Sequence, residues 1–278
     1  MTSGSGLDPV RPLAYAGSWY TSDPARLGRE VDAWLDSVPP LDGRPLGLLA
    51  PHAGLRYSGH VAAWSYAALR QAGDELTVVL VGPSHYAYVH GCAVLRRGGL
   101  ETPWGVLPID AELAEEIAET LSAAEHRAVH AREHALELHL PLLARVRPGA
   151  RVVPIIMGDQ SSASITELAG ALAASVRGRS AVLAASSDLS HYERRERARM
   201  LDGRVLACLD AVDPDALMRL LEREPGHACG GGPMAAVLLA ARELGATAGG
   251  VRQYADSGDV SGDTTRVVGY ASAVWTAA

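Results

Sequence analysis

Short apolar runs recur along the chain, and each is bounded by turn-forming residues. Their residues do not alternate with polar ones, which is typical of strands covered on both faces, as in a parallel sheet between layers of helices. A longer run of the same kind follows a loop rich in Asp and Gly late in the sequence. The strands that this pattern predicts are residues 46–50, 77–82, 151–157, 181–186 and 265–275.

Stretches with a helical spacing of apolar residues lie between these runs. Because strands and helices alternate, the sequence predicts an α/β layered fold with a mainly parallel central sheet flanked by helices. The helices that we predict are residues 24–35, 60–71, 110–123, 134–146, 165–177, 196–211, 214–222 and 233–244.

The sequence contains no internal repeat and no Gly- or Ser-rich linker that could separate two domains. Its 278 residues, 48% of them hydrophobic, suffice for one large core. We therefore expect a flexible N-terminal tail over residues 1–15 and a single α/β domain over residues 16–278. The segment DSGDVSGD at 256–263 lacks the spacing and final Glu of a calcium-binding loop, so we expect a tight turn there.

A formal net charge of −7 and the absence of any Lys- or Arg-rich cluster argue against a nucleic-acid partner, because like charges repel a phosphate backbone. The sequence lacks a signal-like N-terminus and an apolar run of membrane-spanning length, so we expect a cytoplasmic protein without a membrane segment. Its three cysteines are odd in number and show no paired spacing, as expected for a compartment in which thiols stay reduced.

Three of the predicted strands end in a turn of small residues followed by a histidine: GLLAPHAG, VVLVGPSH and VLAASSDLSH. In open α/β sheets, ligands bind beyond the carboxyl ends of the strands, so His52, His85 and His191 are expected to converge. One such histidine alone is more often a loop residue satisfied by backbone groups, but three repeats favour a shared site. Neutral imidazoles on rigid strand ends are suited to iron, copper or zinc.

Cys229 lies in the sequence HACGGGPM, just before a predicted helix. The glycines leave its side chain uncrowded, and the N-terminus of the following helix favours a thiolate. The pattern therefore predicts a reactive or metal-bound cysteine. The alternative is a small buried cysteine in a Gly-rich turn.

The segment EHALELHLP at 133–141 resembles a zinc-protease motif but does not satisfy it. That motif places two histidines four residues apart, whereas His134 and His139 are five apart, or about 140° around a helix. His134 and Glu137 are three residues apart and share a helix face. We assign His134, Glu137 and His139 to the pocket or to positions that orient metal ligands from behind.

Six motifs together resemble the Memo family, whose bacterial members are often called AmmeMemoRadiSam system protein B. The resemblance runs from about Ala16 to Trp275 and implies a fold similar to the LigB-type, class III extradiol dioxygenases, which use non-haem iron. The motifs are AGSWY at 16–20, APHAGLRYSG at 50–59, GPSH at 82–85, EHALELHLP at 133–141, SSDLSHY at 186–192 and CGGGP at 229–233.

By position, the resemblance implies metal ligands at His52, His85 and Cys229. It places Asp188 and His191 among the catalytic or pocket residues, with His191 as an acid/base or oxygen-positioning group. The aromatic residues that we expect to border the pocket are Trp19, Tyr20 and Tyr57. The resemblance implies Fe(II) first, then copper, with zinc less favoured. The thiolate replaces the carboxylate ligand of the dioxygenases, so catechol cleavage does not carry over directly.

The sequence therefore favours a metal-dependent, dioxygenase-like oxidoreductase that acts on a small molecule with O₂. One alternative is a protein that binds a redox metal or a peptide without turnover, and a weaker one is a zinc hydrolase. The partners compatible with these interpretations are a small molecule, O₂, a peptide and a second copy of the chain.

Overall fold

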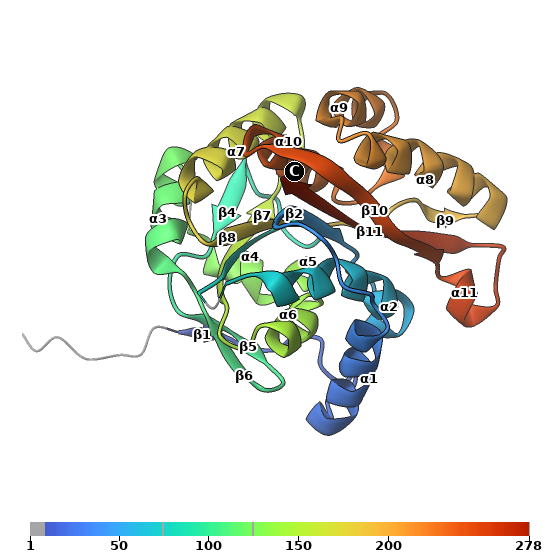
Figure 1. Cartoon of the computed structure of the whole chain (residues 1–278), viewed down its shortest axis with the longest axis horizontal. Helices are drawn as coiled ribbons and strands as arrows, with labels where there is room; N and C mark the ends of the chain where they lie inside the picture. Colours follow the sequence, from blue (N-terminus) through green and yellow to red (C-terminus); the bar gives the residue numbers. More distant parts are fainter. Residues whose placement is uncertain (1–8, 74, 124, 278) are drawn as a thin grey trace, which may run out of the picture.

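A central sheet of eight strands organises the computed structural model, which describes residues 9–73, 75–123 and 125–277 (Figure 1). Seven strands follow one another in the order β10-β11-β2-β8-β3-β7-β4, and β9 pairs with the beginning of β11. The strands of this sheet are β2 (Pro45–Ala50), β3 (Thr77–Pro83), β4 (Cys92–Val94), β7 (Arg151–Met157), β8 (Ala181–Ser186), β9 (His191–Glu193), β10 (Ala246–Asp256) and β11 (Val267–Ala277).

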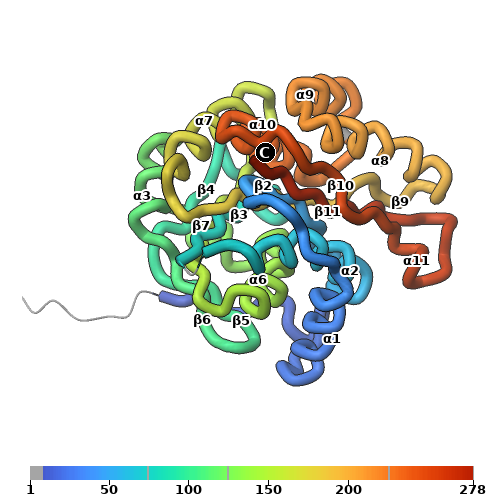
Figure 2. Tube along the Cα trace, in the orientation of Figure 1, coloured from blue at the N-terminus to red at the C-terminus, as the bar shows by residue number. Residues whose placement is uncertain are grey.

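The four inner strands β2, β8, β3 and β7 run parallel, whereas β10, β11 and β4 pair antiparallel with their neighbours. The sheet is therefore mixed, and our prediction of a mainly parallel sheet was wrong. A short connection joins β10 to β11, and such connections produce antiparallel pairs. Figure 2 shows that β2 and β11 lie side by side although they come from opposite ends of the sequence.

Helices cover both faces of this sheet. On one face α10 packs against β8, β2 and α7, and on the other α2 packs against β2 and β11 (Figure 1). The helices are α1 (Pro24–Asp36), α2 (Leu55–Tyr66), α3 (Ala111–Thr120), α4 (Arg127–Ala131), α5 (His134–Glu137), α6 (Leu140–Val146), α7 (Ser162–Val176), α8 (Arg195–Asp210), α9 (Pro214–Arg223), α10 (Gly231–Glu243) and α11 (Gly258–Ser261), with 3₁₀ turns at Ala67–Gln71 and Pro225–His227.

The apolar runs predicted as strands all form strands, because nearly every residue in them is buried between the two helix layers. Several features differ from the sequence prediction: α2 begins at Leu55 rather than at residue 60, and the short strands β4 and β9 were not predicted. The helix predicted over residues 134–146 is divided into α5 and α6, because Pro141 lacks an N–H and its ring would clash with a carbonyl one turn earlier. Strand β10, which is rich in Gly and polar residues, was not predicted at all.

The N-terminal segment joins a second, small sheet in the order β1-β5-β6. Arg11 is buried and forms an ion pair of 2.6 Å with Glu137. The domain therefore begins before Ala16, where we had placed the end of a flexible tail; residues 1–8 of that tail lie outside the described residues. The strands are β1 (Val10–Arg11), β5 (Gly99–Thr102) and β6 (Gly105–Pro108).

Within the described residues, no helix is both long enough and apolar enough to cross a bilayer. The loop at 256–263 contains the single helical turn α11, and its Asp256 forms ion pairs with Arg195 and Arg199.

Candidate metal centre

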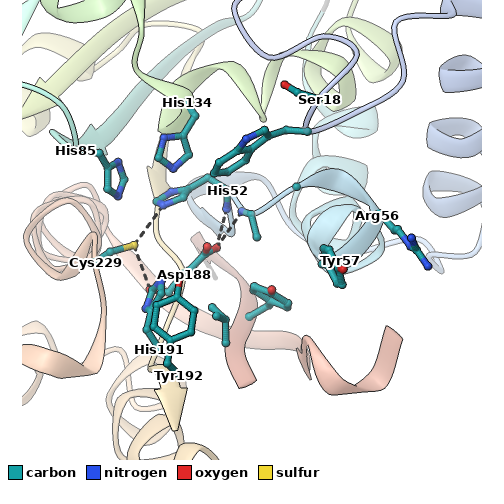
Figure 3. A pocket seen from close by; sticks show the side chains of 15 residues that line it. Ser18, His52, Arg56, Tyr57, His85, His134, Asp188, His191, Tyr192 and Cys229 are labelled. Atoms are coloured by element: carbon teal, nitrogen blue, oxygen red, sulfur yellow. Dashed lines mark hydrogen bonds between the residues drawn. The ribbon is translucent and has the colours of Figure 1, made fainter. Parts of the chain in front are cut away.

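Three neighbouring parallel strands deliver their side chains to one edge of the sheet. His52 lies two residues after β2 and His85 two residues after β3, and the strand between them, β8, leads to Asp188. Cys229 reaches the same point from the loop before α10. One donor atom from each of His52, His85 and Cys229 lies within 4.8 Å of the others, and Cys229 Sγ is 3.2 Å from His52 Nε2 (Figure 3).

These three residues lie at the wall of a cavity of about 770 Å³. Five further residues that we predicted for the site also line it: Trp19, Tyr57, His134, Asp188 and His191. The last four are labelled in Figure 3. The lining residues that sequence reasoning missed include Ser18, Arg56, Tyr192 and Tyr270.

His85 is held by the carboxylate of Glu133. Its Nδ1 lies 2.9 Å from Glu133 Oε1, and its backbone N–H donates to Oε2 at 2.7 Å. Burial tends to raise the pKa of Glu133, but the hydrogen bonds from His85 and Ala135 outweigh it and lower that pKa. An ionised carboxylate can only accept, so Nδ1 of His85 donates to it, which leaves Nε2 as the nitrogen that could bind a metal.

Asp188 holds the turn that carries His52. Its Oδ1 accepts hydrogen bonds from the backbone N–H groups of His52 at 2.8 Å and Ala53 at 3.3 Å. Complete burial raises the pKa of Asp188 to about 7 despite these hydrogen bonds. Asp188, which we predicted as a catalytic residue, therefore positions the turn that carries His52.

The glycines after Cys229 allow its loop to lie directly against the end of β8. A side chain at Gly230 would overlap the carbonyl oxygen of Ser186, and the Gly230 N–H donates to Ser187 Oγ at 2.9 Å. Gln160 pins the loop from the other side, because it donates to the Cys229 carbonyl at 3.0 Å and accepts from Gly232 N–H at 2.7 Å.

Burial, followed by the nearby Asp188 carboxyl, raises the pKa of the Cys229 thiol to about 12. The start of α10 was expected to favour a thiolate, but desolvation outweighs that effect. A thiolate at this depth is stable only beside a positive charge, and a bound metal cation would supply one.

His134 and His191 face the cavity without belonging to the three-residue cluster. The His134 ring is 4.3 Å from that of His85 and 4.5 Å from that of Trp19, centroid to centroid. Burial lowers the pKa of both histidines, that of His134 to about 4. Both rings are therefore neutral near pH 7, each with one nitrogen free to accept a hydrogen bond, although burial makes them weaker bases than a free imidazole.

Three further predicted residues lie behind the cavity: Tyr20, which we expected to border it, and Glu137 and His139, which we assigned to the pocket or to positions behind the metal ligands. Glu137 is fully buried and binds the N-terminal segment: it accepts from Arg11 at 2.6 Å and from the Tyr20 hydroxyl at 2.7 Å. Tyr20 is thereby turned away from the cavity. His139 is also fully buried, and it contacts Ser186 and Tyr66.

A family model described as Memo-like protein matches residues 11–274. The chain belongs to the Memo family. MEMO1 family proteins of Methanothermobacter thermautotrophicus and Methanopyrus kandleri are 35% and 34% identical to it, over 94% and 95% of this chain and 99% and 98% of theirs. The resemblance found in the sequence motifs is thus confirmed.

An uncharacterized protein of Escherichia coli K12 of known crystal structure has a similar fold. The TM-score is 0.54 with 16% sequence identity, over 82% of this Memo-family chain and 99% of the E. coli chain. This likeness concerns the fold alone.

The donor set fits a single metal ion. In a tetrahedral site the distance between a thiolate sulfur and an imidazole nitrogen is about 3.5 Å, close to the 3.2 Å between Cys229 Sγ and His52 Nε2. A second group, His85, Glu133 and His134, also meets the same distance limit, but Glu133 already accepts three hydrogen bonds from His85 and Ala135. The first group is therefore the better candidate centre.

Proposed function

We propose that this protein is a non-haem metal oxidoreductase that acts with O₂ on a small molecule. It binds iron, or copper as the second choice, at His52, His85 and Cys229. The convergence of two imidazole nitrogens and one sulfur at the wall of a cavity carries this proposal. When bound, the metal supplies Lewis acidity and one-electron chemistry.

The chain's own residues provide orientation and proton transfer in this proposal. The cavity of about 770 Å³ is large enough for a small organic substrate, which Trp19 and Tyr57 border. His191 faces the cavity as a neutral imidazole and takes a proton from the substrate. Asp188 keeps His52 in place through its two backbone hydrogen bonds.

Metal content after anaerobic purification tests the site. We expect about one iron or copper ion per chain in the wild type and a loss of most of it in His52→Ala and Cys229→Ser. The matched controls are His126→Ala, which changes an exposed histidine, and Cys208→Ser, which changes a half-exposed cysteine on α8. Metal retained equally in all five proteins would contradict the proposed ligand set.

Oxygen consumption then tests turnover. The metal-loaded protein is expected to consume O₂ only when a substrate from a panel of phenols and other small molecules is present. Tight metal binding without O₂ consumption would favour a binding protein without turnover. Zinc as the ion retained after anaerobic purification would favour a hydrolase.

A further inference from the structure

Behind His52, a row of buried polar side chains leads away from the cavity. Ser186 Oγ lies 2.7 Å from His52 Nδ1 and 2.7 Å from His139 Nε2, and the Tyr66 hydroxyl lies 2.8 Å from His139 Nδ1. Ser186, His139 and Tyr66 are each fully buried. From the sequence, His139 was assigned to the pocket or to positions that orient metal ligands from behind, whereas Ser186 and Tyr66 were assigned no role.

The positions of the hydrogens follow from the partners. Ser186 Oγ also lies 2.6 Å from the carbonyl oxygen of Ala135, which can only accept. The single hydroxyl hydrogen must therefore point to Ala135, since otherwise two oxygen lone pairs would face each other. Ser186 Oγ then accepts from both rings, so Nδ1 of His52 and Nε2 of His139 carry hydrogens.

The far end of the row is consistent with this assignment. Complete burial lowers the pKa of His139 to about 3, so the ring is neutral and its other nitrogen, Nδ1, is an acceptor. The Tyr66 hydroxyl satisfies that acceptor. At the near end, the Nε2 lone pair of His52 faces the Cys229 sulfur. Every donor in the row thus has one acceptor.

We propose that Ser186, His139 and Tyr66 are positioning residues that fix His52 in its Nδ1–H tautomer and thereby present Nε2 to the metal. This inference rests on the metal site proposed above. The two histidine ligands then differ in kind: the anionic carboxylate of Glu133 supports His85, whereas a chain of neutral groups supports His52. Substitution of a residue that supports a metal ligand in this way commonly lowers metal affinity by about 10–100-fold.

The tautomer of His52 can be measured without metal, by long-range ¹H–¹⁵N NMR correlation on metal-free protein labelled with ¹⁵N-histidine. The signal is assigned by its absence in His52→Ala. We expect a single Nδ1–H form. An Nε2–H form would overturn the proposal, whereas a wild type that binds no metal would refute only the proposed function and leave this result readable.

Zinc affinity, measured by competition with a chromophoric chelator, tests the consequence. Ser186→Ala is expected to weaken zinc binding by about 10–100-fold. The matched control is Ser65→Ala, because Ser65 is equally buried but donates to the carbonyl oxygens of Leu49 and Ala273 rather than contacting His52 or His139. Zinc affinity within twofold of the wild type in Ser186→Ala would contradict the proposal.

Tyr66→Phe is a milder second variant, because it keeps the ring and removes only the donor to His139. The freed ring of His139 can then change tautomer, so we expect a second His52 form in the NMR spectrum and a smaller loss of zinc affinity than in Ser186→Ala. An unchanged spectrum together with unchanged affinity would exclude Tyr66 from the row.

Discussion

Gly230 shows how the candidate centre depends on a single residue. Its φ of −105° is open to any amino acid, so backbone conformation does not require a glycine here. The available space does require a glycine, because an added Cβ would lie 2.9 Å from the Cβ of Ser187 and overlap the Ser186 carbonyl oxygen. The absence of a side chain at residue 230 therefore sets how closely Cys229 approaches His52.

Gly230→Ala is expected to push the loop away from β8, destabilise the fold by about 1–3 kcal/mol and lower metal retention. Urea denaturation and metal content check the two effects. Gly226→Ala is the matched control, because an added Cβ there meets nothing within 4 Å. Equal stability and metal content in both variants would show that the loop tolerates displacement.

The ligand candidates could be predicted from the sequence because each histidine follows an apolar run and Cys229 has an unusual glycine-rich setting. Ser186 and Tyr66 could not, since a serine at a strand end and a tyrosine in a helix carry no signal of their own. Their role comes from three-dimensional neighbours: α2 brings Tyr66, and the break before Pro141 turns His139 inward.

At the level of elements, α5 is attached to the N-terminal segment by the buried Glu137. This one carboxylate accepts from Arg11, from the backbone N–H of Tyr15 at 2.8 Å and from Tyr20. The same segment continues to Trp19, whose ring contacts His134 in the cavity. The attachment therefore shapes one side of the site from behind.

Glu137→Gln is expected to cost about 3–5 kcal/mol, because it leaves the Arg11 charge buried without its partner. Hydrogen exchange of residues 10–20 should accelerate in the same variant. Glu30→Gln, which removes one partner of the exposed Arg26–Glu30 pair, should cost less than about 1 kcal/mol. Comparable losses in the two variants would mean that Glu137 contributes no more than a surface charge.

The differences between predicted and observed elements have local and long-range causes. A proline alone explains the divided helix, and the sequence contained that information. The direction of β11 depends on its partners β2 and β10, which apolar patterning does not encode. Strand β10 carries Gly249 and Gly250 and several polar residues, so its position beside β11 decides its conformation more than its own propensity does.

At the scale of the whole molecule, buried histidines link stability to pH. Burial lowers the pKa of His130 and His139 to about 3, below the ordinary value near 6.5 that applies in the unfolded chain. Between these values the unfolded chain binds protons that the folded chain does not. The free energy of unfolding must therefore fall as the pH falls through this window.

For the metal-free protein we expect stability that is insensitive to these histidines above about pH 7 and decreases from about pH 6.5 toward pH 3. Urea titrations at several pH values measure this slope. His130→Gln should reduce the slope of the unfolding free energy with pH by an amount that corresponds to at most one bound proton. His126→Gln, at an exposed residue, should leave this slope unchanged. A slope that is the same in all three proteins would show that His130 does not contribute to the pH dependence of stability.

The place of β11 between β2 and β10 has a consequence for biosynthesis. A ribosome makes residues 267–277 after every other described element, yet this strand joins the parallel core to β10 and also pairs with β9, which carries His191. The nascent chain can thus bury its early helices against β2, β3, β7 and β8. The edge of the sheet at β2, however, stays unpaired until β11 has been made. Synthesis would have to reach this strand before the pocket could close around His191.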